Sequence, residues 1–119
     1  MSQFDLYAQD WWNKNGVYRI LHEINPIRLE FITNNIKTNI INQKKLLNQF
    51  DIKDDLSSFE ILDIGCGGGL LSFELAKLGF FVTGIDENVN SINVAKQKLY
   101  SEISKYKTAL NIKNKNLNN

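Results

Sequence analysis

The spacing of hydrophobic residues changes several times along the 119-residue chain, and the clearest pattern lies between residues 59 and 86. Residues 59–64 form a short apolar run that is typical of a buried parallel strand. Residues 70–78 carry apolar side chains at helical spacing, and residues 80–85 are rich in aromatic and β-branched residues, as in a second strand. These segments predict a β-α-β unit with parallel strands and a right-handed crossover.

The N-terminal part of the chain predicts further helices. Residues 2–13 place aromatic side chains on or near one face of a short helix. We interpret residues 16–24 as a connector, because Asn25 and Pro26 form a typical helix start, a capping side chain followed by proline. Apolar residues continue at helical spacing beyond this start, and residues 39–49 are expected to extend the helical segment.

After the second strand, apolar residues repeat at three- and four-residue steps from Val89 to Leu110, which predicts a helix of about 20 residues. Residues 111–119 are low in complexity and rich in Asn and Lys, so we expect a disordered tail. The predicted organisation is an N-terminal helical segment over 1–58, a partial α/β domain over 59–110 and the tail. This pattern contains only two strands, and sheets of two strands are marginally stable.

Composition narrows the class of protein. Fourteen basic and 13 acidic side chains give a net charge of +1, which shows no bias toward nucleic acid or another polyanion. No apolar run approaches the roughly 20 residues of a membrane span, and no basic-then-apolar signal segment begins the chain. The single cysteine, Cys66, agrees with a reducing compartment. We therefore expect a cytoplasmic protein, with Cys66 as a packed residue rather than a reactive thiol.

The segment between the first strand and the following helix has the composition of a ligand-binding loop. An acid, Asp63, precedes glycines at every second position, namely Gly65, Gly67 and Gly69. Glycines permit positive φ angles and let a ligand lie against bare backbone. The helix that begins near Leu70 would direct its free N–H groups and positive dipole end toward such a ligand.

A second acid, Asp86, ends the next strand, where open α/β sheets place ligands. It follows Gly65 by 21 residues, close to the offset of about 20 at which an acid binds ribose hydroxyls in dinucleotide-binding units. The nicotinamide pattern G-x-G-x-x-G fails, however, because its last position is Leu70 when counted from Gly65 and Ser72 when counted from Gly67. The loop therefore favours an adenosine-type ligand with a cationic amino acid part.

The loop D-I-G-C-G-G-G, with an acid ending the next strand, resembles the first two cofactor motifs of class I S-adenosylmethionine-dependent methyltransferases. Residues 10–13, D-W-W-N, and residues 21–29, L-H-E-I-N-P-I-R-L, resemble two signatures of the ubiquinone biosynthesis O-methyltransferases. The match covers residues 4–96. It implies an α/β fold, a truncated Rossmann-like class I methyltransferase fold that is the first part of a doubly wound parallel sheet, preceded by N-terminal helices.

The resemblance also implies an activity and a set of cofactor-binding residues. The activity is methylation of phenolic hydroxyls on polyprenylated catechol or quinol intermediates, with S-adenosyl-L-methionine as cofactor. The arginine would contact the methionine carboxylate, the glycines would admit the amino acid end, the first acid would organise the loop or bind the ammonium, and the second would bind the ribose. The residues expected to hold the cofactor are Arg28, Asp63, Gly65, Gly67, Gly69 and Asp86. No catalytic residue or metal ligand is assigned.

Two features of the sequence allow more than one interpretation. The aromatic residues of segment 2–13, including Trp11 and Trp12, pack onto the following helix in the plain interpretation, or else form a lid over the cofactor site or a lipid-facing patch. His22, the one histidine, is expected to make a structural hydrogen bond, with a role as general base as the alternative. For a family that acts on polyprenyl substrates, peripheral contact with the inner membrane and with other ubiquinone-biosynthesis enzymes is also expected.

Compared with the resembling family, residues 37–58 look like a polar insertion, and the strands expected after residue 110 are missing. We therefore expect a truncated or degenerate form, or one completed by another chain, with little activity alone. Two other functional classes stay open. One is a nicotinamide-dependent oxidoreductase fragment, disfavoured by Leu70 and Ser72, and the other is a non-catalytic remnant or membrane-associated interaction fragment.

Overall fold

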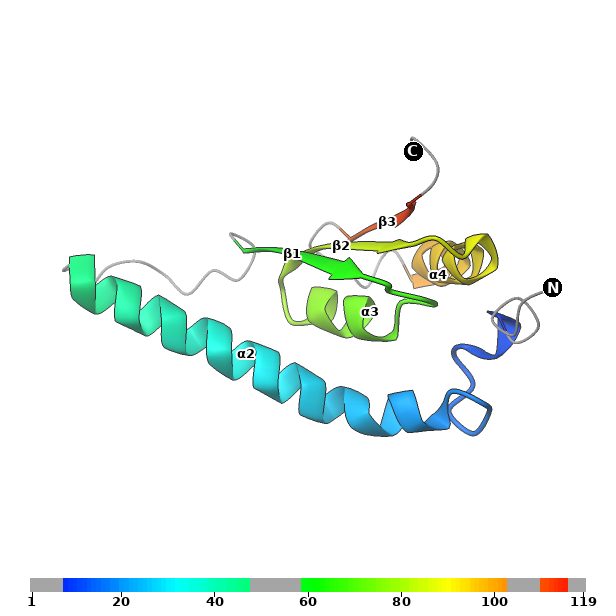
Figure 1. The fold of residues 1–119 in the computed structure, drawn as a ribbon, viewed down its shortest axis with the longest axis horizontal. Coiled ribbons are helices and arrows are strands. Elements are labelled where there is room, and N and C mark those ends of the chain that lie inside the picture. The colour runs from blue at the N-terminus through cyan, green and yellow to red at the C-terminus, as the bar shows by residue number, and fades with distance from the viewer. Residues whose placement is uncertain (1–7, 48–58, 103–109, 116–119) are drawn as a thin grey trace.

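A computed structural model describes residues 8–47, 59–102 and 110–115, and the elements follow one another as helices and strands around a small parallel sheet (Figure 1). The elements in chain order are η1 (Ala8–Asp10), α2 (Arg19–Leu47), β1 (Glu60–Ile64), α3 (Leu70–Lys77), β2 (Phe81–Asp86), α4 (Val89–Glu102) and β3 (Leu110–Asn114). The helix predicted over residues 2–13 lies partly outside the described residues, and of its described part only Ala8–Asp10 is helical, as the 3-10 helix η1.

The three strands are parallel and lie in the order β1-β2-β3. Ile61 pairs with Val82, which in turn pairs with Leu110, so that these positions share one face of the sheet. Because each right-handed crossover moves in the same direction, α3 and α4 cover that same face. The predicted β-α-β unit and the α/β fold class are confirmed.

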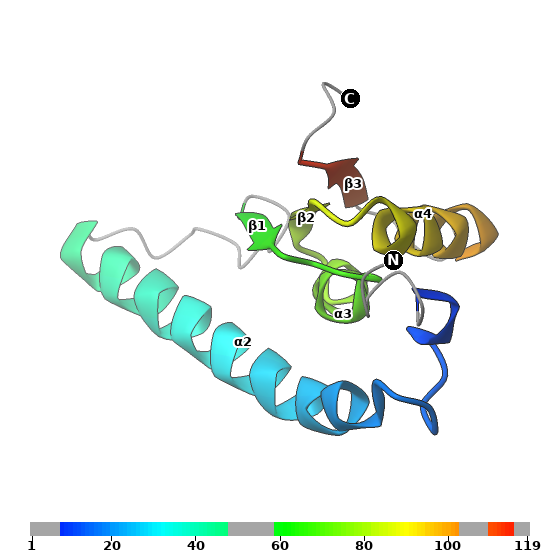
Figure 2. The same cartoon turned by 45° about the vertical axis from the view of Figure 1, so that its right-hand side comes forward.

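The hydrophobic core lies between the sheet and these two helices. Phe73 of α3 and Phe80, which directly precedes β2, are fully buried, and Ile92 of α4 packs beside them. Truncating a buried phenylalanine to alanine typically costs about 3–5 kcal/mol, so these side chains dominate the stability of the unit. Helix α2 crosses beneath α3 (Figures 1 and 2) and contributes partly buried side chains to this core.

Helix α2 is a single helix of 29 residues, and its start differs from the prediction. It begins at Arg19, so residues 19–24 are helical rather than a connector, and Pro26 lies inside the helix. The turn before it is already organised, because the Asp10 carboxylate accepts the Val17 N–H at 2.9 Å and the Arg19 N–H donates to Gly16. At this interior position a proline removes the hydrogen bond to the His22 carbonyl and its ring crowds that carbonyl, which usually kinks a helix. The predicted extension over residues 39–49 is helical as far as Leu47.

The C-terminal prediction is wrong for residues 110–114. Helix α4 ends at Glu102, residues 103–109 lie outside the described residues, and Leu110 belongs to β3 instead of the helix. The sequence L-N-I-K-N alternates in burial, with Leu110 and Ile112 inward and Asn111 and Lys113 outward, which is the period of a strand. The polar residues of this segment made the short alternation difficult to recognise in the sequence. Pairing with β2 stabilises the strand. The sheet therefore has three strands instead of two.

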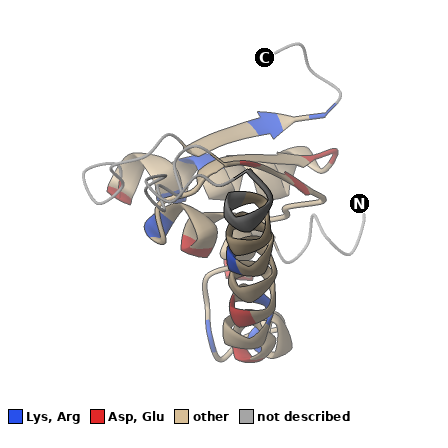
Figure 3. Cartoon of the chain, turned by 90° about the vertical axis from the view of Figure 1, so that its left-hand side faces the viewer, with Lys and Arg blue, Asp and Glu red and all other residues tan. Residues whose placement is uncertain are grey.

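The described part of the chain contains no helix with the length and apolar character needed to cross a membrane. Acidic and basic positions are interspersed along α2 rather than gathered by sign (Figure 3). This distribution agrees with the nearly balanced charge of the whole sequence.

Candidate cofactor site

The glycine-rich loop between β1 and α3 has the backbone geometry that its sequence predicts. Gly65, Gly67 and Gly69 have φ angles of 76°, 57° and 94°. Other residues adopt this left-handed region only at a cost, so glycine at every second position is required by the backbone. A Cβ at Gly65 would meet no atom within 4 Å, so open space lies beside the first glycine. A Cβ at Gly69 would lie 2.8 Å from the Phe73 ring, which makes Gly69 a packing position as well.

The end of β2 holds this loop in place. The N–H groups of Gly65 and Cys66 donate to the Ile85 carbonyl at 2.8 and 2.9 Å. The Gly67 N–H donates to Asp86 Oδ2 at 2.9 Å, while Asp86 Oδ1 accepts the Asn88 N–H at 2.8 Å. Each carboxylate oxygen has two lone pairs, so Asp86 retains acceptor capacity beyond these two bonds. Asp86 thus organises the loop, a role beyond the ligand contact that the sequence suggested.

A cavity of about 400 Å³ opens at the carboxyl ends of β1 and β2. Its size falls in the range of small-molecule sites, and its position is the one that open α/β sheets use for ligands. The residues that line it are Trp11, Gly65, Gly67, Asp86, Glu87, Asn88 and Ser91.

A second cavity, of about 180 Å³, adjoins the first, because Trp11 and Gly65 line both. Arg28 and Asp63 line this second cavity, together with Cys66. Five of the six residues predicted to hold a cofactor therefore line one or the other of these two neighbouring cavities, and Gly69 is the exception.

Arg28 has an unusual environment within the smaller cavity. Its Nη2 donates to Asn25 Oδ1 at 2.7 Å, and Asn25 Nδ2 in turn donates to the Leu70 carbonyl at 2.9 Å. The buried Arg28 Nε has no hydrogen-bond partner among the described residues. Buried donors are rarely left unpaired, and a guanidinium is suited to a carboxylate, so this atom fits an anionic ligand group. Asn25 is therefore not a helix cap. It links Arg28 to the start of α3.

Asp63 lies beside this arginine and is supported by a residue that the sequence analysis did not single out for this role. The fully buried Ser72 hydroxyl donates to Asp63 Oδ2 at 2.7 Å. Burial raises the pKa of the Asp63 carboxyl, while the Ser72 hydrogen bond and the Arg28 charge act in the opposite direction. The Cys66 thiol next to it is buried, and burial raises its pKa to about 12. Cys66 is thus a packed thiol, as predicted.

The two tryptophans cover the glycine loop. The Trp11 ring stacks on Tyr18, with centroids 3.8 Å apart and planes 7° from parallel, and its Nε1 donates to Ser91 at 3.0 Å. It also contacts the loop, since a Cβ at Gly67 or Gly68 would overlap the indole. The ring is buried beside both cavities, so it is not a lipid-facing patch. Tyr18 and Leu21, at the start of the following helix, pack in the same cluster as Trp11, as the plain interpretation predicted, and the lid over the cofactor site stays a prediction.

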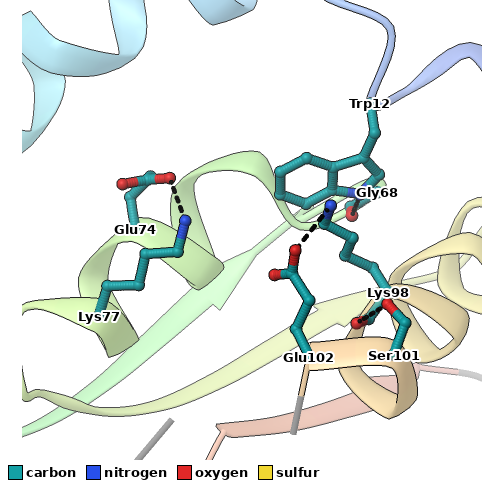
Figure 4. Close-up of polar contacts among 7 residues, drawn as sticks. All are labelled: Trp12, Gly68, Glu74, Lys77, Lys98, Ser101 and Glu102. Atoms are coloured by element: carbon teal, nitrogen blue, oxygen red, sulfur yellow. Dashed lines mark hydrogen bonds and ion pairs between the residues drawn. The ribbon is translucent and has the colours of Figure 1, made fainter. Parts of the chain in front are cut away.

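Trp12, which belongs to the N-terminal segment, contacts the same loop and also α3 and α4 (Figure 4). Its Nε1 donates to the Gly68 carbonyl at 3.0 Å, and Lys98 lies 4.6 Å from its ring centroid. His22 Nε2 lies 2.9 Å from the Trp11 carbonyl oxygen, and a carbonyl only accepts, so His22 makes the predicted structural hydrogen bond.

Sequence reasoning missed the contacts that cross the chain. Trp11 and Ser91 are 80 residues apart, and no local period predicts such a pair. Asn25 was visible only as a possible cap, and Ser72 only as a failed position of the nicotinamide pattern. Within the described ranges there is no group of three His, Cys, Asp or Glu side chains that could hold a metal ion.

Comparison with known proteins defines the class. A family model described as a methyltransferase domain matches residues 55–115, about half of the chain. The chain therefore belongs to the methyltransferase domain family, and its parallel sheet with a glycine loop after β1 is Rossmann-like.

Individual relatives are more specific. The ubiquinone biosynthesis O-methyltransferase of Colwellia psychrerythraea is 41% identical over 96 residues, covering 81% of this chain and 36% of that protein. That of Rickettsia prowazekii is 42% identical over 101 residues, covering 82% and 35%. A solved SAM-dependent methyltransferase from Methanosarcina mazei is 40% identical with a TM-score of 0.43, covering 60% of this chain and 32% of that one. The chain thus spans about a third of these curated relatives, and the resemblance seen in the sequence is confirmed.

Proposed function

We propose that this chain forms the cofactor-binding part of an S-adenosylmethionine-dependent O-methyltransferase of ubiquinone biosynthesis. The acceptor would be a phenolic hydroxyl of a polyprenylated catechol or quinol, and the similarity to ubiquinone biosynthesis O-methyltransferases supports this proposal. The observation that carries the proposal is the pair of neighbouring cavities that share Gly65, with Asp86 lining one and Arg28 lining the other.

The residues present fit the two ends of this cofactor. Its ribose offers two hydroxyls, and Asp86 keeps acceptor capacity for them. Its amino acid end carries a carboxylate and an ammonium, and these match the unpaired Arg28 Nε and the Asp63 carboxylate. Gly65 and Gly67 would let the ligand lie against the backbone between these ends.

When bound, S-adenosylmethionine supplies a methyl group on a positively charged sulfur, open to in-line attack by a phenolic oxygen. The contribution of this chain would be alignment, because two ends held by fixed groups restrict the reacting centre to one geometry. Asp86 holds the Gly67 N–H while it binds the ribose, so the loop and the ligand share one anchor. His22 donates its Nε2 hydrogen to a carbonyl, and we assign it no role as base.

Calorimetric titration with S-adenosylhomocysteine tests the cofactor site. We expect saturable binding by the unmodified chain and a loss of about ten- to hundredfold in Asp86→Asn or Arg28→Met, the range for hydrogen bonds to charged groups. Glu74→Gln is the matched control, because Glu74 lies on α3 and pairs with Lys77, away from both cavities. Undiminished affinity in Asp86→Asn would contradict the ribose role, and an unmodified chain that does not bind would contradict the cofactor assignment.

We also propose peripheral contact with the inner membrane, where a polyprenylated acceptor would reside. Exposed apolar side chains on α2 support this proposal, with Ile27 68% and Phe31 69% exposed. Co-sedimentation with phospholipid vesicles should decrease in the Ile27→Ser and Phe31→Ser double variant. Equal co-sedimentation of the two proteins would count against this surface. Contact with other ubiquinone-biosynthesis enzymes belongs to the same proposal and would be seen as co-purification.

A further inference from the structure

Among the described residues, one side chain from outside the β-α-β unit donates a hydrogen bond to the glycine loop. The anchors within the unit are the Ile85 carbonyl and the Asp86 carboxylate, which hold Gly65, Cys66 and Gly67. The outside anchor is Trp12, whose Nε1 donates to the Gly68 carbonyl at 3.0 Å (Figure 4).

This anchor fixes one peptide plane from both sides. In a planar trans peptide the carbonyl of Gly68 and the N–H of Gly69 point in opposite directions. The Gly69 N–H donates to the Cys66 carbonyl at 3.0 Å, and the Gly68 carbonyl accepts from Trp12. Rotation of this plane would break both bonds, so the indole locks the last turn of the loop before α3.

We propose that Trp12 is a positioning residue for cofactor binding, which acts by holding the Gly68–Gly69 peptide and with it the glycine loop. The proposal rests on the proposed function, because it takes this loop to be the part that receives the cofactor. Trp12 lines neither of the two cavities described above, so its effect would pass through the loop and not through a ligand contact.

The indole is itself held in one orientation. Its ring meets the Phe73 ring edge to face, with centroids 5.2 Å apart, and Phe73 is a fully buried residue of α3. Lys98 of α4 lies 4.6 Å from the ring centroid and pairs with Glu102 at 3.0 Å (Figure 4). Trp12 thus contacts the loop, the helix that follows the loop and α4, and its N–H has little freedom to point elsewhere.

A loop with so many glycines needs such an anchor. Glycine loses more conformational freedom on ordering than any other residue, and a loop that must be ordered on binding weakens affinity by that cost. A loop that is already ordered avoids it. Removing one neutral hydrogen bond should therefore weaken cofactor binding by about two- to tenfold.

The test is Trp12→Phe, which keeps an aromatic ring against Phe73 and Lys98 and removes the N–H. Titration with S-adenosylhomocysteine is done well below the melting temperature of every variant, so that a loss of stability alone does not change the dissociation constant. Ile112→Val is the matched control, because it removes one buried methyl group from β3, far along the chain from the loop. We expect a two- to tenfold weaker affinity in Trp12→Phe and an unchanged affinity in Ile112→Val.

Amide hydrogen exchange gives a second readout that needs no ligand. Exchange at Gly67, Gly68 and Gly69 should be faster in Trp12→Phe than in the unmodified chain, with no such change in Ile112→Val. Where the unmodified chain binds the probe, equal affinity of Trp12→Phe overturns the proposal whatever the exchange shows. Where it does not bind, the proposed function fails, and unchanged loop exchange would overturn the positioning role separately.

Discussion

The surroundings of Cys66 keep its thiol protonated. The side chain is 7% exposed and lies close enough to Asp63 and Asp86 for both charges to act on it. Burial is the main cause of its raised pKa, about 12 against the ordinary 9.0, and the two carboxylates add to it. The thiol is therefore protonated at neutral pH, although it is part of the loop that we propose as the cofactor site.

A thiol-reactive reagent should consequently label the folded chain slowly. At pH 8 the thiolate fraction is lower by roughly a thousandfold than for an ordinary thiol, and the thiolate is the reacting species. The signal belongs to Cys66, because the sequence has one cysteine. Absorbance with an aromatic disulfide should show slow labelling in buffer and fast labelling in urea. Equally fast labelling in both would contradict the buried position.

At the scale of elements, the glycine loop and the N-terminal segment pack closely against each other. Gly68 is not among the glycines with positive φ in the described chain, so its backbone does not require glycine. The lack of space beside Gly68 does require glycine, because a Cβ there would overlap the Trp11 indole. The requirement for glycine at the middle position of Gly67-Gly68-Gly69 thus arises from Trp11, 57 positions earlier in the sequence.

Gly68→Ala should therefore destabilise the chain by about 1–3 kcal/mol, the usual range for overpacking. Urea unfolding of Gly68→Ala, Trp11→Ala and the double variant measures the coupling between them. We expect the Gly68→Ala effect to shrink or vanish when Trp11 is already alanine, because the overlapping ring is gone. Additive effects would mean that the alanine is harmful for another reason.

The same elements show what a sequence can predict. β1, α3 and β2 follow from local periods, and the positive φ angles of Gly65, Gly67 and Gly69 follow from their spacing after an acid. The start of α2 does not, because the Asn25–Pro26 signal is local, whereas Asn25 is occupied by Arg28 and by the carbonyl of Leu70. A hydrogen bond between residues far apart in the sequence thus outweighed the local preference of Asn25 for a helix cap.

In the candidate site, the sequence predicted residues that border the cavities, but it did not predict the residues that orient them. Arg28, Asp63 and Asp86 border the cavities as expected from the motifs. The orienting partners, such as Ser72 and Trp12, come from contacts that only the folded chain brings together. The D-W-W-N motif marked Trp12 without showing what it contacts, and nothing in the sequence indicated that Ser72 supports Asp63.

At the scale of the whole molecule, the sheet is covered on one face. Val82 and Ile112 point toward α3 and α4 and are buried, while Leu62 and Ile64 of β1 point to the other face and are exposed. Stability should therefore come from residues on the covered face, and β3 matters because it adds Leu110 and Ile112 to that face.

A comparison of two isoleucines tests this asymmetry and the existence of β3 together. Ile112 is 7% exposed and Ile64 is 71% exposed, and both lie in parallel strands. Ile112→Ala should cost about 2–4 kcal/mol in urea unfolding, because it leaves a cavity in the core. Ile64→Ala should cost less than about 1 kcal/mol, because its side chain is already in water. A harmless Ile112→Ala would mean that residues 110–114 do not pack on the sheet, and the two-stranded pattern predicted from the sequence would then be the better description.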